Sequence, residues 1–412
     1  MNPYGSKPVR ALAVCAAALF AAAAAALYVL RERVTRGLQP QSQPSLPRPP
    51  RPVPGIAVLR QTPESWRAAT GYRSYSSLIV GLALAEIAAR QPGRSLVYFS
   101  GTDVNTRWNT GVPYEVARRH GWLLEDRAGH LLVNRNYPSN YVADVGNPAY
   151  QRAWLDRVSR ILRRNGDRGV FLDDVIVDLA PLAGTEAAKY PTARQWAKAQ
   201  LSFVRTVSDG LRAEGYYVLV NASAYVRGSR AANDGSGALA WWRRLAPHVS
   251  GLADEYYQET SNGSNTLRSY GPAWYQGWSG WQRLMATTQS LGKDFFGVTY
   301  GPADDARRMS YARASFLLDW NGGGGAFVYQ PTDGRDPWNG AWTRDIGQPE
   351  APKRRVGTAW LRTYSRGIAL VNPDPSRPQR VDLGHVYLAP DGKPTSQLTL
   401  GPTTGLVLPR AR

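Results

Sequence analysis

Cysteine and histidine are scarce in this sequence of 412 residues. The single cysteine, Cys15, lies in an apolar segment near the N-terminus, so we expect neither a disulfide nor a thiolate zinc site in the folded part. The four histidines contain no pair at i, i+4, which argues against a His-rich zinc site or an HExxH protease. No G-x-S-x-G motif occurs, which weakens an α/β-hydrolase interpretation. We therefore expect a protein that uses no metal and no other cofactor.

Acidic residues are in the minority, because 31 Asp and Glu stand against 50 Lys and Arg and leave a net charge of +19. Such a charge is common in nucleic-acid-binding proteins. The excess here is mostly Arg scattered along the chain, with only short runs such as 353–355, and no nucleic-acid-binding motif is present. We expect no nucleic-acid partner; attraction to an anionic envelope or an acidic polysaccharide explains the charge equally well.

The N-terminus predicts a membrane-targeting segment. The stretch Ala11–Leu30 is uncharged, and its 20 residues are about the length of a helix that spans a bilayer. Basic residues flank it on both sides, so residues 1–37 are either a signal anchor or a long signal peptide. Residues 38–54 are Pro-rich and predict a stiff, extended linker. We expect an extracytoplasmic domain that is anchored in the cell membrane, or secreted if the segment is cleaved.

From Gly55 onward, strand-like and helix-like segments alternate. The clearest helix begins at Asn147 and Pro148, has apolar residues at helical spacing, and ends at Gly166. Repeated βαβ units require a parallel sheet, and eight of them over residues 55–350 predict a (β/α)₈ TIM barrel. An open doubly wound sheet is the alternative, but no G-x-G-x-x-G follows the first strand. The strands are expected at Gly55–Arg60, Ser77–Val80, Ser95–Ser100, Gly169–Asp174, Tyr216–Val220, Ser250–Tyr257, Phe295–Tyr300 and Gly325–Tyr329.

Two further regions lack this alternation of strands and helices. Residues 101–146 are irregular, with a hairpin expected around Arg127–Gly129. From about Gly357, short alternating segments are broken by Gly and Pro, which is typical of antiparallel strands. We therefore expect a small C-terminal β domain over residues 351–412.

Carboxyl groups lie at the ends of two expected strands. Asp173 and Asp174 end one strand, and Asp254 and Glu255 lie in another. Barrel enzymes carry their reactive residues at the carboxyl ends of the strands, and glycoside hydrolysis needs one protonated and one ionised carboxyl group. Because side chains alternate along a strand, Asp173 should share the face of Phe171 and point into the barrel. The alternatives are a helix cap or salt bridge for the aspartates and a surface charge for Glu255.

The aromatic composition fits a sugar-binding site, although large cores use the same rings. Trp and Tyr number 14 and 22, whereas Phe numbers only 8. Six residues could bind the substrate, through ring packing against sugar faces or hydrogen bonds to sugar hydroxyl groups: Asp103, Asn221, Tyr257, Trp274, Trp278 and Trp320. For each of them, a role in a turn or in core packing is the alternative.

A family resemblance adds to this interpretation, and it is carried by the motifs at residues 121–130, 141–158, 169–175, 218–225 and 250–259. The chain resembles bacterial glycosyl hydrolases of the glycosyl-hydrolase-like family 15, and more distantly the barrels of endo-α-1,4-polygalactosaminidases, over roughly residues 55–410. The resemblance implies that Asp173 is the nucleophile or base and Glu255 the acid. Asp174 and Asp254 depart from the commoner pattern, and either neighbour could share or take over a role.

Three functional hypotheses follow. The leading one is an O-glycosyl hydrolase that acts on an extracellular or cell-wall polysaccharide through two carboxyl groups. The second is a non-catalytic carbohydrate-binding protein on the same barrel, which would keep the aromatic lining without needing both carboxyl groups. The third is an anchored envelope scaffold, which predicts neither sugar binding nor turnover.

Overall fold

The computed structural model of the chain describes residues 52–60, 74–81, 94–107, 111–223, 236–259, 266–270 and 277–411. The expected membrane segment, the linker up to residue 51, and the helix expected near Leu82–Arg90 lie outside these ranges. None of the helices within them combines the length and apolar character needed to cross a membrane.

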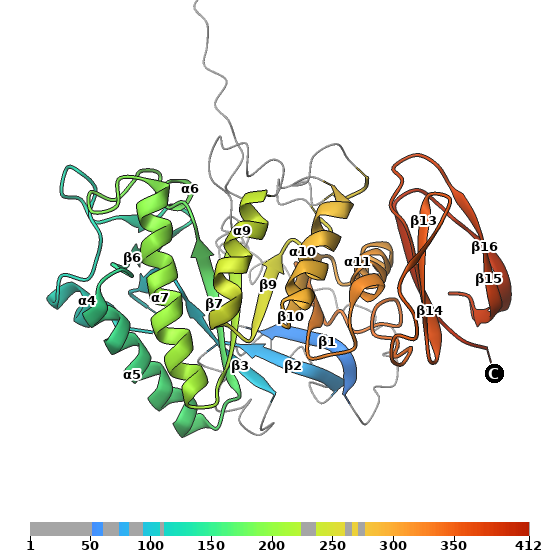
Figure 1. Ribbon diagram of the computed structural model, residues 1–412, viewed down its shortest axis with the longest axis horizontal. Coiled ribbons are helices and arrows are strands. Elements are labelled where there is room, and N and C mark those ends of the chain that lie inside the picture. The colour runs from blue at the N-terminus through green and yellow to red at the C-terminus, as the bar shows by residue number, and fades with distance from the viewer. Residues whose placement is uncertain are drawn as a thin grey trace, which may run out of the picture.

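Eight parallel strands close into a barrel, which confirms the TIM-barrel prediction over the open sheet (Figure 1). The strands follow the order β1-β11-β10-β9-β8-β7-β3-β2 around the barrel. All eight segments expected from the sequence form strands, with ends that differ by a few residues. Their bounds are β1 (Val53–Arg60), β2 (Tyr75–Val80), β3 (Ser95–Ser100), β7 (Gly169–Ile176), β8 (Tyr217–Ser223), β9 (Gly251–Glu255), β10 (Asp294–Gly301) and β11 (Ala326–Pro331).

The helices cover the outside of the barrel (Figure 1), and α11 is buried on almost all sides because it lies between the barrel and the C-terminal sheets. Asn147 caps the first long helix, its side chain accepting a hydrogen bond from the backbone N–H of Ala149, and Gly166 ends it in the left-handed conformation. Its buried side chains, such as Trp154 and Val158, recur at helical spacing and pack toward the strands. The bounds are α5 (Pro148–Asn165), α7 (Ala193–Ala213), α9 (Ser236–Leu245), α10 (Trp278–Ser290) and α11 (Ala306–Asp319), with the short α4 (Tyr114–Arg119), α6 (Ala180–Ala183) and η2 (Ala246–His248).

The irregular region between β3 and α5 contains a small antiparallel sheet at the carboxyl end of the barrel. Its strands are β4 (Asp103–Asn105), β5 (Val133–Asn134) and β6 (Tyr137–Val142), in the order β4-β6-β5. The expected hairpin is present: Glu125 pairs with Leu131, and Gly129 has the positive φ that the turn requires. This insertion brings β4 and β6 next to the barrel mouth.

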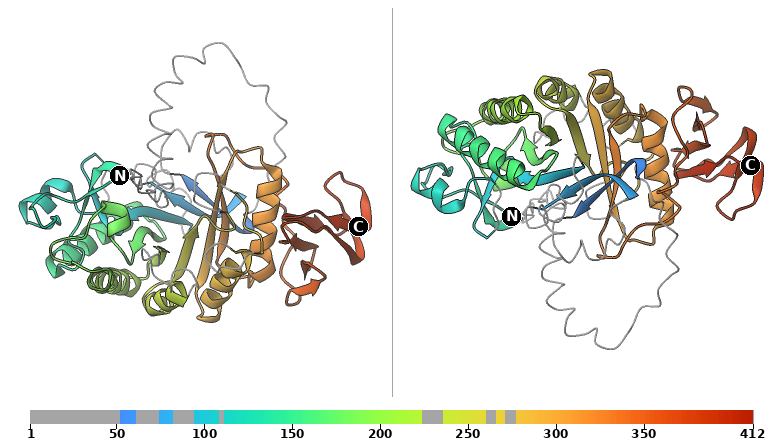
Figure 2. Two further views of the ribbon diagram at one scale, coloured as in Figure 1. Left: turned by 90° about the horizontal axis from the view of Figure 1, so that it is seen from above. Right: turned by 90° about the horizontal axis from the view of Figure 1, so that it is seen from below.

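The C-terminal region forms two antiparallel sheets around their own apolar core, as expected. One sheet consists of β12 (Arg354–Val356), β13 (Ala359–Tyr364), β14 (Gly367–Asn372) and β17 (Thr404–Pro409). The other pairs β15 (Gln379–Leu388) with β16 (Pro394–Leu400). Figure 2 shows both sheets beside α11, on the opposite side of the barrel from α4.

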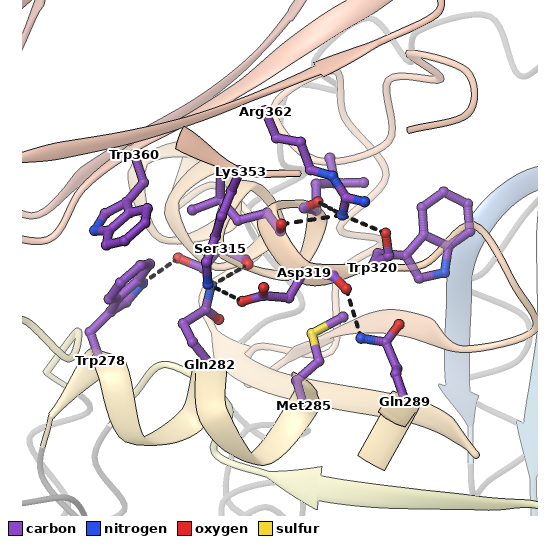
Figure 3. Close-up of polar contacts among 12 residues, drawn as sticks. Trp278, Gln282, Met285, Gln289, Ser315, Asp319, Trp320, Lys353, Trp360 and Arg362 are labelled. Atoms are coloured by element: carbon purple, nitrogen blue, oxygen red, sulfur yellow. Dashed lines mark hydrogen bonds and ion pairs between the residues drawn. The ribbon is translucent and has the colours of Figure 1, made fainter. Parts of the chain in front are cut away.

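Two cations fasten the C-terminal sheets to the end of α11 (Figure 3). Nη1 of Arg362 donates to three carbonyl oxygens of the last turn, including that of Trp320 at 2.6 Å. Nζ of Lys353 lies 2.5 Å from Oδ2 of Asp319 and over the rings of Trp278 and Trp360. The last carbonyls of a helix lack partners within it, and Arg362 supplies donors to them, whereas Lys353 pairs with the side-chain carboxylate of Asp319.

We expect Arg362→Ala to lower the free energy of unfolding by about 2 kcal/mol, since hydrogen bonds to a charged group are lost and carbonyls are left unpaired. Urea denaturation measures this change. Arg366→Ala is the matched control, because its pair with Asp345 is exposed and should contribute less than about 1 kcal/mol. Equal losses in the two variants would contradict a capping role for Arg362.

Candidate active site

The inward-facing rows of three neighbouring strands change from apolar to polar at their carboxyl ends. The barrel interior is filled by alternate residues such as Phe171 on β7, Leu219 on β8 and Ala253 on β9. Two residues further along each strand, on the same face, lie Asp173, Asn221 and Glu255. The structure therefore brings the two expected catalytic carboxyl groups to one mouth of the barrel.

Three donors converge on the Asp173 side chain, which is 8% exposed. The Tyr98 hydroxyl donates to Oδ2 at 2.5 Å, and Nδ2 of Asn221 donates to Oδ1 at 2.7 Å. The backbone N–H of Asp174 donates to the same Oδ1 at 2.9 Å. Donors on both oxygens suit a negatively charged carboxylate held in one orientation.

Glu255 lies in a different environment. Burial and, to a smaller extent, the charge of Asp173 raise its pKa to about 8, although hydrogen bonding to Tyr300 and Asn221 opposes the change. Asn221 therefore donates to both carboxyl groups and links them. Asp173 is held by several donors, whereas the pKa of Glu255 is raised. Such a contrast between neighbouring carboxyl groups allows one to act as the acid and the other as the base at neutral pH.

Two further carboxyl groups lie close to this pair. Asp174 has a φ of 57°, and burial together with Asp173 raises its pKa well above the usual range. Asp103 on β4 is fully buried and accepts hydrogen bonds from Asn134 and Asn140 at 2.9 and 3.1 Å. Burial raises the pKa of Asp103 to about 6. The site thus combines four carboxyl groups.

A tight turn holds the Asp173–Asp174 bulge in place. The N–H of Gly101 donates to the carbonyl of Asp173 at 2.6 Å, and the Thr102 hydroxyl donates to the carbonyl of Asp174. A Cβ on Gly101 would lie 2.9 Å from the carbonyl oxygen of Asp173, so only glycine allows this approach. Gln200 on α7 donates in turn to Thr102 at 2.7 Å.

The structure does not bring four of the expected residues to the site, and their placement corrects the expectation that they line it. Asp254 faces the helix layer, where burial raises its pKa well above the usual range and Arg268 opposes the change. The hydroxyl of Tyr257 donates to Gln282 on α10, and its ring is fully buried. The remaining two, Trp278 and Trp320, are buried at the ends of α10 and α11.

The reasons are local. After Glu255 the chain leaves the strand at Tyr256, whose φ is 61°, and this turn directs Tyr257 away from the barrel mouth. The two indoles sit on apolar helix faces instead of in loops, and the Trp278 indole N–H donates to Ser315 of α11. Trp274 lies outside the described residues.

Four tyrosines at the site were not expected from the sequence. Tyr98 and Tyr300 hydrogen-bond to Asp173 and Glu255, and the ring of Tyr256 lies 5.1 Å from that of Tyr300. Tyr137 on β6 lies within electrostatic reach of Asp173, Asp174 and Glu255. Alternation along β3 and β10 could have identified Tyr98 and Tyr300, because both share a face with apolar residues of the barrel interior. No sequence signal marks Tyr137 or Tyr256.

Across the described parts of the chain, no group of three or more His, Cys, Asp or Glu side chains is arranged to hold a metal ion. The chemistry that this constellation can perform is acid–base and nucleophilic catalysis by carboxyl groups. A closed (β/α)₈ barrel with such carboxyl groups at its carboxyl end has the architecture of a glycoside hydrolase.

The sequence model described as "Hypothetical glycosyl hydrolase family 15" matches residues 98–368, which is more than half of the chain. The chain belongs to this family, and the resemblance noted from its motifs is confirmed. A search of curated proteins gave no match.

Several solved structures are similar in fold. The glycoside hydrolase domain of PelA from Pseudomonas aeruginosa is 17% identical, with a TM-score of 0.42 over 68% of this chain and 96% of its own. Aspergillus fumigatus Ega3, solved in complex with galactosamine, is 12% identical, with a TM-score of 0.41 over 74% and 98%. The maltogenic α-amylase AmyB from Thermotoga neapolitana is 8% identical, with a TM-score of 0.48 over 87% and 99%.

Proposed function

We propose that the protein hydrolyses O-glycosidic bonds of an extracellular or cell-wall polysaccharide, with Glu255 as the general acid and Asp173 as the nucleophile or base. The observation that carries this proposal is the contrast between the two carboxyl groups that Asn221 links. Asp173 accepts three hydrogen bonds, whereas burial raises the pKa of Glu255 to about 8 and keeps it protonated at neutral pH.

The steps follow from these protonation states. Glu255 donates its proton to the glycosidic oxygen, and the bond between that oxygen and the anomeric carbon breaks. Asp173 either bonds to the anomeric carbon or takes a proton from the water that attacks it. In the first case water then cleaves the glycosyl-enzyme, and Glu255 takes up the proton of that water. In the second case Asp173 ends with the proton of the water and Glu255 ends ionised, so Asp173 releases that proton to solvent and Glu255 takes one up before the next turnover. In both cases one water is consumed.

The charge of the site bears on the substrate. Asp103, whose pKa is raised only to about 6, is mostly ionised at neutral pH, and together with the Asp173 carboxylate it repels a sugar that carries its own carboxylate; a neutral or amino sugar meets no such penalty. We therefore propose a neutral or amino-sugar polysaccharide. We also propose an extracytoplasmic location, which the uncharged stretch Ala11–Leu30 and the Pro-rich linker after it support.

The test is reducing-end release by the full-length protein from neutral, amino-sugar and uronic-acid polysaccharides, including cell-wall and secreted ones. Release by the wild type, and its loss in Asp173→Asn and Glu255→Gln, is the expected result. Binding of a glycan without any release would favour the carbohydrate-binding alternative, and release that survives both changes would contradict the assigned roles.

We expect Tyr137 to contact the sugar. It is half-buried and lies within reach of the four carboxyl groups, so Tyr137→Ala should raise KM by about tenfold with little change in kcat. Tyr141→Ala is the matched control on the same strand, because its ring packs against Tyr114. Steady-state kinetics on the best polysaccharide measure both. A similar KM for the two variants would show that Tyr137 makes no useful contact.

A further inference from the structure

The end of β10 has a backbone group that β9 cannot pair. The register pairs Val298 with Glu255, the last residue of β9, while β10 continues to Gly301. The N–H of Tyr257 still reaches the carbonyl of Val298, at 2.8 Å. Two residues later the N–H of Tyr300 points to the same side, where the strand partner has ended.

A buried carboxylate takes the place of the missing strand. Beyond β9 the chain turns through two residues with positive φ, Tyr256 and Gln258, and brings Glu259 back beside β10. Oε1 of Glu259 accepts the hydrogen bond from the N–H of Tyr300 at 2.6 Å. The Glu259 side chain is fully buried, and a buried charge is costly unless each oxygen has a partner.

Its second oxygen is held from α11. Nη1 of Arg308 lies 2.8 Å from Oε2 of Glu259, and Nε of Arg308 lies 3.1 Å from Oδ2 of Asp305. The Asp305 side chain also caps α11 by accepting a hydrogen bond from the backbone N–H of Arg308. The beginning of α11 therefore fixes Glu259, and Glu259 fixes the backbone of Tyr300.

We propose that Glu259 is a positioning residue for Glu255 and acts through Tyr300. The backbone of Tyr300 is tied to Glu259, while its side chain packs with the barrel interior, where its hydroxyl interacts with the Glu255 carboxyl group and lowers the pKa of that group. Glu259 lies outside the barrel mouth and contacts no group that would react. The positioning is a property of the folded chain, whereas its effect on turnover rests on the proposed hydrolysis.

The experiment measures the titration of Glu255 by ¹³C NMR on full-length protein labelled at the glutamate carboxyl carbon, with Glu255→Gln to assign the signal. The double variant Glu259→Leu/Arg308→Met removes the buried ion pair as a unit; Asp305 also loses Arg308, but it is partly exposed to water and keeps its hydrogen bond from the backbone of α11. We expect it to raise the Glu255 midpoint by about one pH unit, since one ordinary hydrogen bond to the ionised form is lost. Tyr300→Phe should give the same rise, and combining all three changes should add nothing further.

Two more variants test whether the shift comes from the lost hydrogen bond to the Tyr300 backbone or from the lost charge of Glu259. Glu259→Asp keeps the charge and the ion pair with Arg308, but its side chain is one methylene shorter and cannot hold the Tyr300 backbone in the same place. This variant should therefore also raise the titration midpoint of Glu255. Glu259→Gln keeps an oxygen for the Tyr300 N–H, so the midpoint should not rise. An unchanged midpoint in the double variant and in Glu259→Asp, or shifts that add in full to that of Tyr300→Phe, would overturn the positioning role.

Turnover supplies the second readout. In the double variant kcat should fall by about tenfold with KM unchanged, because Glu255 is misplaced while the sugar contacts remain. If the wild type releases no reducing ends from any glycan, the proposed function fails. The NMR midpoints still decide whether Glu259 positions Glu255, so the two failures are distinguishable.

Discussion

Glu255→Gln is expected to lower kcat by about a thousandfold while glycan binding stays within a few-fold of the wild type. The amide has the shape of the acid but has no proton to give to the leaving oxygen, and general acid catalysis contributes roughly 10²–10⁴ in rate. Asp173→Asn should cause a loss at least as large, because the amide can neither attack the anomeric carbon nor accept a proton from water. Reducing-end release measures the loss, and calorimetric titration of the glycan measures binding.

Two controls separate the roles. Asp254→Asn alters the neighbour of Glu255 that faces the helix layer, so turnover should persist. An aryl glycoside with a good leaving group needs little protonation, so it should restore turnover to Glu255→Gln but not to Asp173→Asn. Full activity of Asp173→Asn together with loss in Asp174→Asn would transfer the role to Asp174.

The positions of the two reacting groups could be predicted because two simple rules combine. The alternation of apolar strands and helices predicts a barrel, and barrel sites lie at the carboxyl ends of the strands. Period-two alternation then decides the face, which is how Phe171 predicts the inward direction of Asp173. Glu255 follows Ala253 in the same way, and both rules depend only on residues that are local in the sequence.

The tyrosines around these groups depend on contacts between distant segments. Tyr137 reaches the site only because β4 and β6 pair into a sheet beside the barrel, and no local pattern specifies that pairing. Tyr257 is the opposite case, a residue expected at the site that the structure places elsewhere. Its aromatic ring and hydroxyl favour a sugar contact, yet the left-handed residue before it turns the ring toward α10. The indoles of Trp278 and Trp320 also fit a sugar-binding role by residue type, but Trp278 begins α10, Trp320 ends α11, and both pack in the core.

The raised pKa of Glu255 predicts that this catalytic group destabilises the fold above neutral pH. Its pKa in the folded state is about 8, against an ordinary value of 4.5. The folded protein therefore binds this proton more tightly than the unfolded chain does. The stabilisation that results is fully present below about pH 4.5 and is lost as the pH rises to about 8. Asp103, whose pKa is raised to about 6, adds a change of the same sign.

Glu255→Gln removes the contribution of this group to the pH dependence of stability, because an amide does not ionise between pH 4 and pH 9. We expect the variant to have a Tm about 3–6 °C above that of the wild type at pH 9 and close to it at pH 4. Scanning calorimetry at the two pH values measures the difference. The matched control is Glu214→Gln, since Glu214 is exposed and pairs with Arg163 on the surface.

A higher Tm for Glu255→Gln at pH 4 instead would contradict the sign, because the acid is protonated there in both states and burial no longer opposes a charge. With the expected sign, the environment that keeps Glu255 protonated for catalysis is also the one that weakens the fold as the group ionises. The same ionisation should lower kcat/KM above about pH 8, where Glu255 can no longer donate a proton. Turnover and the stability difference should therefore titrate together, which a purely structural role for Glu255 does not predict.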